Sequence, residues 1–408
     1  MTHKSAVSPG DRKALAVANF FVADVQAGVG PFLGVLLASR GWGTAAIGAV
    51  TALGNAVGLA STTPAGALID ATRRKRFWVA AAAICTVAAS ALVLVSRDFW
   101  VVAAAQAAAA VAAAVLGPAI IGITLGVVRQ SGFVAQNGRN QAYNHAGNMV
   151  GAALSGCLGW YFGFAAVFVL AAAFAIVAVV ATLSIPARHI DDQAARGAAD
   201  VHDGVVASGL QILARSPALR ALAAAVLLFH LGNAAMLPLY GLAVVAHKAD
   251  PFITVAATVV VAQAVMVIAS LAATRIARRR GYWTVFTIAF IALPVRGLVA
   301  ASIITTWGIV PVQILDGIGA GMLSVAVPGL VAQLLEGTGH INIGQGALMT
   351  AQSLGACLSP LLGGYIAQEF GFRLAFACLG ALSVGSLLIW HKCASAIRAA
   401  EAPAVQEH

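Results

Sequence analysis

Asp24 is one of two carboxyl groups that lie inside the long apolar stretches of this sequence. It is near the middle of the stretch over residues 14–38, and its helical face also carries Phe20, Gly28 and Pro31. An ionised carboxyl group is costly in hydrocarbon, so it should face a cavity, a partner or water, and it can bind and release a proton. We predict that Asp24 couples proton movement to the protein's activity. The alternative is a packing role, in which a neighbouring helix holds it by a hydrogen bond.

Asp316 is the second such carboxyl group, near the middle of the stretch over residues 307–334. It begins the run Asp-Gly-Ile-Gly-Ala-Gly, and Arg296 lies one apolar stretch earlier at a similar depth. A paired charge costs much less than two single ones, and the glycines permit close helix approach, so we predict a structural ion pair. The alternatives are proton coupling by Asp316, and gating or binding of a substrate carboxylate by Arg296.

His230 is the third candidate for proton coupling, because histidine can change its charge in the physiological pH range. It lies in the apolar stretch over residues 220–246. No ligand spacing supports a metal site, and none is expected. The remaining polar side chains of the apolar stretches could line a cavity or bond helix to helix. These candidates are Asn19, Gln26, Gln106, His145, Asn148, Asn233, Gln263, Gln313 and Gln352.

The composition is that of a polytopic membrane protein. Of 408 residues, 61% are hydrophobic and only 9% are charged, whereas roughly a quarter are charged in soluble proteins. The net charge of +10 does not indicate nucleic-acid binding, because most bases sit in short loops and are not interleaved with aromatic residues. Residues 1–13 lack an apolar core, so no removable signal peptide is expected. The five cysteines are odd in number, and no disulfide framework is expected.

Twelve apolar windows of about 20 residues or more predict twelve membrane-spanning helices in an all-α protein. The expected spans are 14–38, 45–69, 77–95, 99–128, 141–161, 164–185, 220–246, 252–274, 282–304, 307–334, 343–367 and 373–391. With the N-terminus inside, 19 of the 24 lysines and arginines fall on the cytoplasmic side. This bias predicts that both termini are cytoplasmic.

The two halves of the chain repeat one another. Three pairs of matching segments are separated by 204 to 207 residues, namely Pro31–Gly34 with Pro238–Gly241, Trp100 and Gln106 with Trp307 and Gln313, and Leu154–Tyr161 with Leu358–Tyr365. Such near-constant offsets indicate a parallel repeat of six helices plus six. We therefore predict an N-terminal bundle over residues 1–185, a cytoplasmic linker over 186–217, and a C-terminal bundle with a short cytoplasmic tail over 218–408.

A short cationic loop separates the second and third predicted helices. Its residues resemble the loop signature of the major facilitator superfamily, and the matching positions are Gly66, Leu68, Asp70, Arg74 and Lys75. Two positions depart from that signature, where Ala71 replaces an arginine and Arg73 replaces a glycine. Together with the twelve helices and the repeat, the loop makes the chain similar to this superfamily over almost its whole length.

The resemblance implies two pseudo-symmetric six-helix bundles that enclose a central cavity and rock to open it to either side. Asp24, His230 and Asp316 would then lie on helices that line the cavity. Asp70 would meet the cytoplasmic start of the eleventh helix and lock one state, since an anion is favourable at a helix N-terminus. Arg129, at the end of the fourth helix, could join that gate.

An intramembrane acid in the first helix is similar to the drug and small-molecule:proton antiporters of the superfamily, which favours export of a small amphipathic solute. One departure is that Gly147-x-x-x-Gly151 is followed by Ala152, where those antiporters have a Gly-Pro pair. The alternative is proton-coupled uptake of an organic acid or a siderophore-like solute. A non-transport alternative is a membrane sensor derived from a transporter.

No enzyme signature and no P-loop for ATP is present, so we expect neither enzyme activity nor a cofactor, with the proton gradient as the energy source. The expected partners are the lipid bilayer, a small-molecule substrate and protons, without nucleic acid. A monomer is expected, since one chain encloses a complete path. The abundance of alanine and glycine is compatible with a high-GC bacterium and hence with its inner membrane.

Overall fold

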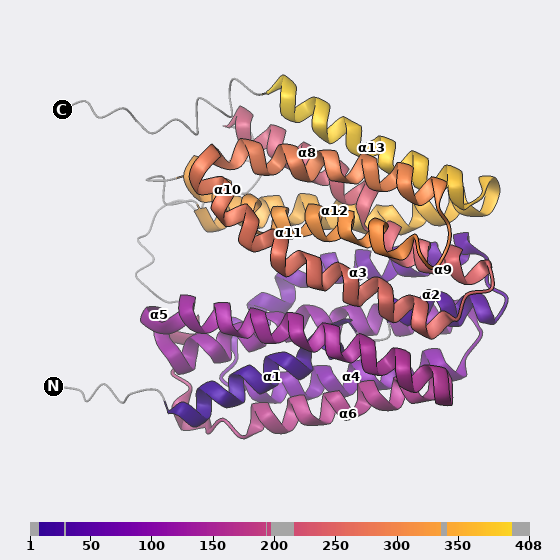
Figure 1. The fold of residues 1–408 in the computed structure, drawn as a ribbon. Coiled ribbons are helices and arrows are strands. Elements are labelled where there is room, and N and C mark those ends of the chain that lie inside the picture. The colour runs from indigo at the N-terminus through magenta and orange to yellow at the C-terminus, as the bar shows by residue number, and fades with distance from the viewer. Residues whose placement is uncertain (1–7, 28–29, 193, 197–215, 336–340, 394–408) are drawn as a thin grey trace, which may run out of the picture. The chain divides into compact units, whose positions relative to one another are not determined.

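The computed structural model describes residues 8–27, 30–192, 194–196, 216–335 and 341–393, and within these ranges every long element is an α-helix (Figure 1). Two short 3-10 helices, Ala187–His189 and Ala194–Arg196, follow the sixth element. The α-helices are α1 (Pro9–Ala27), α2 (Gly30–Ser39), α3 (Thr44–Ala71), α4 (Lys75–Val95), α5 (Phe99–Phe162), α6 (Phe164–Leu183), α8 (Pro217–Asn233), α9 (Met236–Ala246), α10 (Pro251–Ser302), α11 (Ile309–Leu334), α12 (Ile341–Phe370) and α13 (Phe372–Lys392).

Each of the twelve predicted helices coincides with a helical segment. Two pairs of elements, α1 with α2 and α8 with α9, each occupy one predicted span. Conversely, α5 and α10 each contain two predicted helices, separated by a backbone break at Arg129 and at Gly281. The predicted all-α membrane class is thus confirmed for the part of the chain that the structure describes.

Nine stretches among the described residues are long and apolar enough to cross a membrane. One of them is the whole of α10, which holds two of the predicted spans. The second part of α5 and the whole of α12 are not among the nine, because they carry more polar residues. These are the helices predicted over residues 141–161 and 343–367.

The break in α5 is unusual because it falls on a residue with a side chain. Arg129 has φ 55° and ψ 178°, whereas the break in α10 uses Gly281 with φ 77° and ψ 168°. Glycine adopts such angles without a steric penalty, but for any other residue they cost of order 1–3 kcal/mol. The surroundings of Arg129 must therefore hold this conformation in place.

The described residues form two compact units. Unit 1 contains those within Met1–Leu36 and Leu53–Gly204, and unit 2 those within Leu37–Ala52 and Val205–His408. The predicted linker includes the boundary at residue 204, but the predicted domains assigned residues 37–52 to the first bundle. In unit 2 these residues pack on α12, where the Thr44 hydroxyl donates to the carbonyl oxygen of Gly364 at 2.9 Å.

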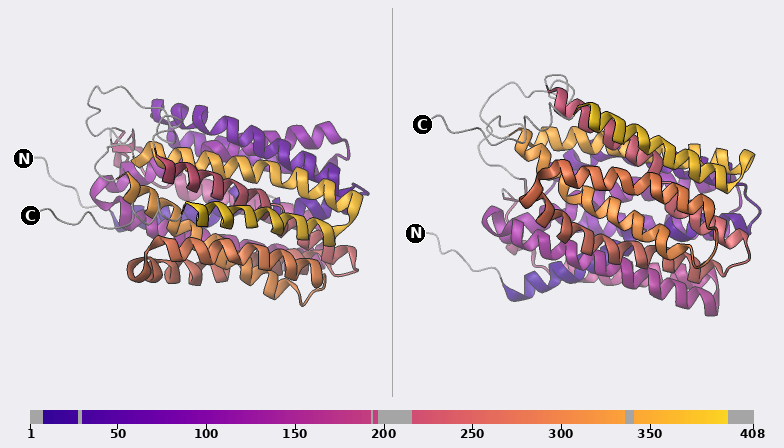
Figure 2. Two further views of the ribbon diagram at one scale, coloured as in Figure 1. Left: turned by 90° about the horizontal axis from the view of Figure 1, so that it is seen from above. Right: turned by 45° about the horizontal axis from the view of Figure 1, so that its top comes forward.

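The core of each unit is built from small and aliphatic side chains. In unit 1, α1, α4, α5 and α6 meet around Leu15, Val79 and Ile123, all fully buried. In unit 2, α8, α10, α11, α12 and α13 lie side by side, as Figures 1 and 2 show from three directions. Their core includes Phe286 and the fully buried Trp390.

The closest helix contact in unit 1 joins α1 to the second part of α5. A side chain at Gly147 would collide with the carbonyl oxygen of Phe20, and a Cβ at Gly151 would lie 2.5 Å from Oδ1 of Asp24. Glycines four residues apart thus form a groove that receives one face of α1, since helices in a membrane associate mainly by close packing of small residues.

A close glycine contact also joins the corresponding helices of unit 2, α8 and α12. A side chain at Gly355 of α12 would collide with the carbonyl oxygen of Leu227 and would lie 2.9 Å from the backbone nitrogen of Leu231, both on α8. Leu227 and Leu231 follow Phe20 and Asp24 by 207 residues, and Gly355 follows Gly151 by 204. The corresponding helices are thus in contact in both units, but the glycine that meets the carbonyl oxygen lies one helical turn later in α12 than in α5.

The first prediction concerns this contact. We expect Gly147→Leu to lower the free energy of unfolding in detergent by at least about 1–3 kcal/mol, because the new side chain pushes α1 away from α5. The control is Gly138→Leu on the same helix, where the space around a Cβ is open. Thermal unfolding curves compare the two variants with the wild type, and equal melting temperatures would contradict the predicted packing.

Candidate functional site

The most polar cluster of unit 2 surrounds Arg296. This residue, on the second part of α10, is 0% exposed, and its Nη1 lies 2.7 Å from Oδ1 of Asp316 on α11. The same Nη1 donates to Oδ1 of Asn233 on α8 at 2.6 Å, and its Nη2 donates to Oε1 of Gln313 at 3.2 Å. The structure thus brings together four of the residues that the sequence singled out, from three helices.

Asn233 closes a ring of hydrogen bonds with the ion pair. Its amide nitrogen donates to Oδ1 of Asp316 at 3.1 Å while its amide oxygen accepts from Arg296. A buried pair of opposite charges persists only when further hydrogen bonds satisfy both groups, and this ring supplies them. Two buried nitrogens, Nε of Arg296 and Nε2 of Gln313, have no partner among the described residues.

The helix hairpin explains why the pair forms. Arg296 lies six residues before the end of α10 at Ser302. Asp316 lies seven residues after the start of α11 at Ile309. At about 1.5 Å per residue, both therefore lie roughly 10 Å from the connection. The glycine after Asp316 brings α11 close to the first part of α10, where a Cβ at Gly317 would lie 2.8 Å from the carbonyl oxygen of Ala262.

Asp24 in unit 1 has a different environment. It is half-buried on α1, and no hydrogen bond or ion pair joins its carboxylate to another described residue. Its Oδ1 packs against Gly151 of α5, where any side chain would collide with the carboxylate. Of the two intramembrane carboxylates, Asp316 is therefore neutralised by a cation and Asp24 is not.

His230 lies on α8 near the cluster in sequence, but its ring makes a local bond. Its Nδ1 is 2.8 Å from the carbonyl oxygen of Val226 one turn earlier, so this nitrogen carries the proton. Leu231, not His230, occupies the position equivalent to Asp24. Among the described residues there is no group of three or more His, Cys, Asp or Glu side chains that could hold a metal ion.

The other candidate residues do not form one described cluster. Asn19 donates to the carbonyl oxygen of Leu15 in its own helix at 2.8 Å, and Asn148 donates to Asn144 at 3.3 Å. The side chain of Gln26 lies outside the described part. The remaining candidates are half-buried on their helices, namely Gln106, His145, Gln263 and Gln352.

The cationic loop divides into exposed and buried parts. Leu68, Asp70 and Arg74 are exposed, and the space around Gly66 is open. Lys75, in contrast, is only 2% exposed, and its amino group donates to the carbonyl oxygen of Thr72 at 2.9 Å. Lys75 therefore packs within unit 1, and the role of the loop as a conformational gate stays a prediction.

Arg129 has a partner that we did not expect. The sequence suggested that it joins Asp70, but its Nη2 lies 3.2 Å from Oδ2 of Asp191, in the segment predicted as linker. The backbone nitrogen of Asp191 also donates to the carbonyl oxygen of Gly126 at 3.0 Å. This short segment is thus docked on α5, and the docking holds the strained backbone at Arg129.

Sequence reasoning missed two further polar contacts in unit 1. Asp11 pairs with His189 at 2.8 Å, which joins the start of α1 to the docked segment. A buried chain of hydrogen bonds links Gln136 to Asn140 and Asn140 to Thr124 across the break in α5. Distance from the helix end gave no signal for the second contact, because Thr124 lies five residues before the break whereas Asn140 lies eleven residues after it.

Comparisons with known proteins agree on one family. Residues 15–342 match the sequence profile of the Major Facilitator Superfamily. The chain is 38% identical over 390 residues to an uncharacterised MFS-type transporter of Mycobacterium tuberculosis, known from strains CDC 1551 / Oshkosh and ATCC 25618 / H37Rv, and the match covers 94% of this chain and 93% of that protein.

Solved transporter structures share the fold. A mutant of the nucleoside transporter NupG superposes with a TM-score of 0.80 at 14% identity, covering 94% of this chain and 99% of the other. A bacterial homologue of the human lysosomal transporter Spinster, in its inward-facing and unoccupied conformation, gives a TM-score of 0.77 at 13% identity, covering 98% and 100%. At these identities the likeness concerns the fold alone.

The second prediction concerns the buried pair. We expect Arg296→Met and Asp316→Leu, made singly, each to lower the free energy of unfolding by about 3–5 kcal/mol, because each leaves an uncompensated buried charge. The double variant should regain most of this loss, because it removes both charges. A double-mutant cycle of unfolding measurements in detergent tests this, and simple additivity of the two losses would contradict the pairing.

Proposed function

Because the chain belongs to the Major Facilitator Superfamily, we propose that it is a secondary active transporter that exports a small amphipathic solute in exchange for protons. Membership of the family makes it a multi-pass membrane transporter; the coupling, the direction and the solute are the proposal. In this proposal the solute crosses by alternating access and the proton gradient supplies the energy, without a further cofactor.

The observation that carries the proposal is the state of Asp24. Its carboxylate lies on a membrane-spanning helix, half-buried, without an ion pair or hydrogen bond to a described residue, and packed directly against Gly151 of α5. A carboxylate without a protein partner in such a place must obtain its compensation from a proton, from water or from a bound solute. A group that exchanges a proton for a solute must meet this requirement.

The other two candidates for coupling are less suited to this role. Asp316 would have to lose its bond to Arg296 before it could bind a proton, and the ring with Asn233 opposes that loss. His230 uses one ring nitrogen for the carbonyl oxygen of Val226, which leaves only the other for a solute or a proton. We therefore assign coupling to Asp24 and a structural role to the Arg296–Asp316 pair.

The exchange follows from competition at one carboxyl group. When Asp24 is protonated, it is uncharged and tolerates the apolar helix surface around it. When the proton leaves, the ionised group favours a solute with a cationic or hydrogen-bond-donating part. The apolar part of the solute would contact the small side chains of the neighbouring helices. One proton and one solute thus bind alternately, and each releases the other.

Uptake of an organic acid or a siderophore-like solute is the second candidate, and it would need an anion-binding group. Arg296 is the one arginine among the described residues that lies inside a predicted membrane span away from the ends of that span. Its guanidinium group is fully buried and already bonded to Asp316, Asn233 and Gln313. A substrate carboxylate would have to displace these partners, so the geometry favours export.

We also propose the placement of the chain in the membrane. The distribution of lysine and arginine supports cytoplasmic termini and a cytoplasmic position for the loop over residues 73–76. The similarity to a mycobacterial protein supports the bacterial inner membrane, and a single chain is proposed as the working unit.

The third prediction tests the coupling. In sealed proteoliposomes with a pH-sensitive dye inside, a panel of amphipathic amines and organic acids is added to the wild type and to Asp24→Asn. We expect at least one solute to drive proton movement through the wild type, and the variant to move protons at least about tenfold more slowly. The direction of the pH change separates exchange from symport.

The control for this test is Asp250→Asn. Asp250 caps the start of α10 by accepting from the backbone nitrogens of Phe252 and Ile253, and asparagine caps a helix equally well. This variant should behave like the wild type. Coupling through Asp24 is refuted if Asp24→Asn moves protons with a solute at the wild-type rate. If solutes bind and none crosses, the sensor alternative replaces the transporter.

The fourth prediction tests the orientation. In a background without the five natural cysteines, Arg73→Cys and Arg97→Cys are treated with a membrane-impermeant maleimide in intact and in permeabilised cells. Both positions are exposed. We expect label at position 97 in intact cells and at position 73 only after permeabilisation. The reverse pattern would place the termini outside.

A further inference from the structure

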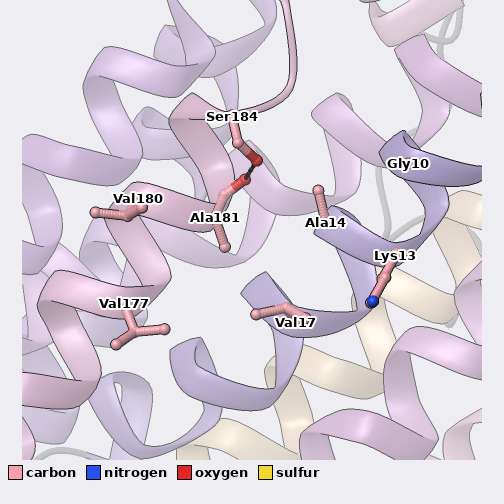
Figure 3. Close-up of a pocket in the computed structure, with 8 residues that line it drawn as sticks. All are labelled: Gly10, Lys13, Ala14, Val17, Val177, Val180, Ala181 and Ser184. Atoms are coloured by element: carbon pink, nitrogen blue, oxygen red, sulfur yellow. Dashed lines mark hydrogen bonds between the residues drawn. The ribbon is translucent and has the colours of Figure 1, made fainter.

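A groove lies at one end of unit 1, between the first two turns of α1 and the last two turns of α6 (Figure 3). Its volume is about 340 Å³. Most of the side chains that line it are small or aliphatic. The lining consists of Gly10, Lys13, Ala14 and Val17 on α1, and Val177, Val180, Ala181 and Ser184 on α6.

The groove opens onto the face of α6 that meets lipid. Val180, at its rim, is 61% exposed in the protein alone, and Ile176 and Leu183 of the same helix are exposed as well. In a membrane such side chains contact hydrocarbon. Water does not stably fill a space lined by alanine and valine, because it finds too few polar partners there. The surrounding lipid is therefore the molecule that can occupy the groove.

A lysine side chain, that of Lys13, lies at the end of the groove nearest the start of α1. Lys13 is exposed, forms no hydrogen bond or ion pair with a described residue, and is one of the residues that line the groove. The nearest carboxylate in sequence, Asp11, is buried and bonded to His189 at 2.8 Å, so it does not neutralise Lys13. Arg12, next in the chain, is also exposed and adds to the positive charge.

The depth of Lys13 matches that of a lipid headgroup. α1 begins at Pro9, so Lys13 lies about 6 Å along the helix from its first residue, and its flexible side chain can reach the interface. The valines lie one and two turns deeper, at the level of the acyl chains. A cationic group above an apolar groove fits an amphiphile with an anionic head and a hydrocarbon tail.

We propose that this groove binds an anionic phospholipid, with one acyl chain along Val17, Val177 and Val180 and with the phosphate on the amino group of Lys13. Basic pockets between membrane-spanning helices bind such headgroups in other membrane proteins. The bound lipid would fill the space between α1 and α6. It would thus support the helix that carries Asp24 without touching Asp24 itself.

The test measures lipid binding to the purified protein in detergent by native mass spectrometry. Phosphatidylglycerol and phosphatidylcholine with the same acyl chains are titrated against the wild type, Lys13→Gln, and Lys392→Gln as the matched control, since Lys392 is an exposed lysine at the end of α13. We expect phosphatidylglycerol to bind several-fold more tightly than phosphatidylcholine, and Lys13→Gln to weaken it about fivefold. Lys392→Gln should leave the tightest binding event unchanged.

A second variant distinguishes the contribution of the lipid's acyl chain from that of its headgroup. Val180→Trp places a large side chain at the exposed rim, where it can enter the groove without disturbing the core. We expect it to weaken both lipids, whereas Lys13→Gln weakens only the anionic one. Equal binding of the two lipids by the wild type would overturn the proposal, as would equal losses in Lys13→Gln and Lys392→Gln. Oleate binding as tightly as phosphatidylglycerol would overturn the assignment to a phospholipid.

Discussion

The contact between α1 and the second part of α5 is the constraint on which the rest of unit 1 depends. Inside a membrane the hydrophobic effect does not drive helices together, so their association rests on close packing and on polar bonds. Gly147 and Gly151 let the backbone of α1 approach at Phe20 and Asp24. Gly151 makes room for the carboxylate of Asp24 itself, which packs against α5 without a polar partner among the described residues.

Unit 2 also packs the corresponding helices closely, through a glycine of α12. Gly355 receives Leu227 and Leu231, so the position equivalent to Asp24 carries an aliphatic side chain. Conversely, the positions that lie 205 and 207 residues before Arg296 and Asp316, within the range of offsets found for the repeat, are Ala91 and Ala109. The repeat therefore keeps the corresponding helices in contact, while of the two intramembrane carboxylates the one in unit 1 has no described polar partner and the one in unit 2 is paired with an arginine.

Sequence reasoning reached those features that depend on distance along a helix. The helix spans and the equal depths of Arg296 and Asp316 follow from apolar windows and from the position of a hairpin. It could not reach features that depend on helix rotation, because helices that are apolar all round give no periodic signal. The motif Gly147-x-x-x-Gly151 was visible, but its partner on α1 was not. The pairing of Arg129 with Asp191 was also hidden, because a polar linker gives no indication of where it docks.

The central claim is that Asp24 holds a proton that the solute displaces, and proton release on binding tests it most directly. The purified protein in weakly buffered detergent solution is mixed with its solute in the presence of a pH indicator, where no gradient or flux contributes. The account predicts release of about one proton per protein by the wild type and by Asp250→Asn, and none by Asp24→Asn. Release by Asp24→Asn equal to that of the wild type would contradict the account and move the proton to another group.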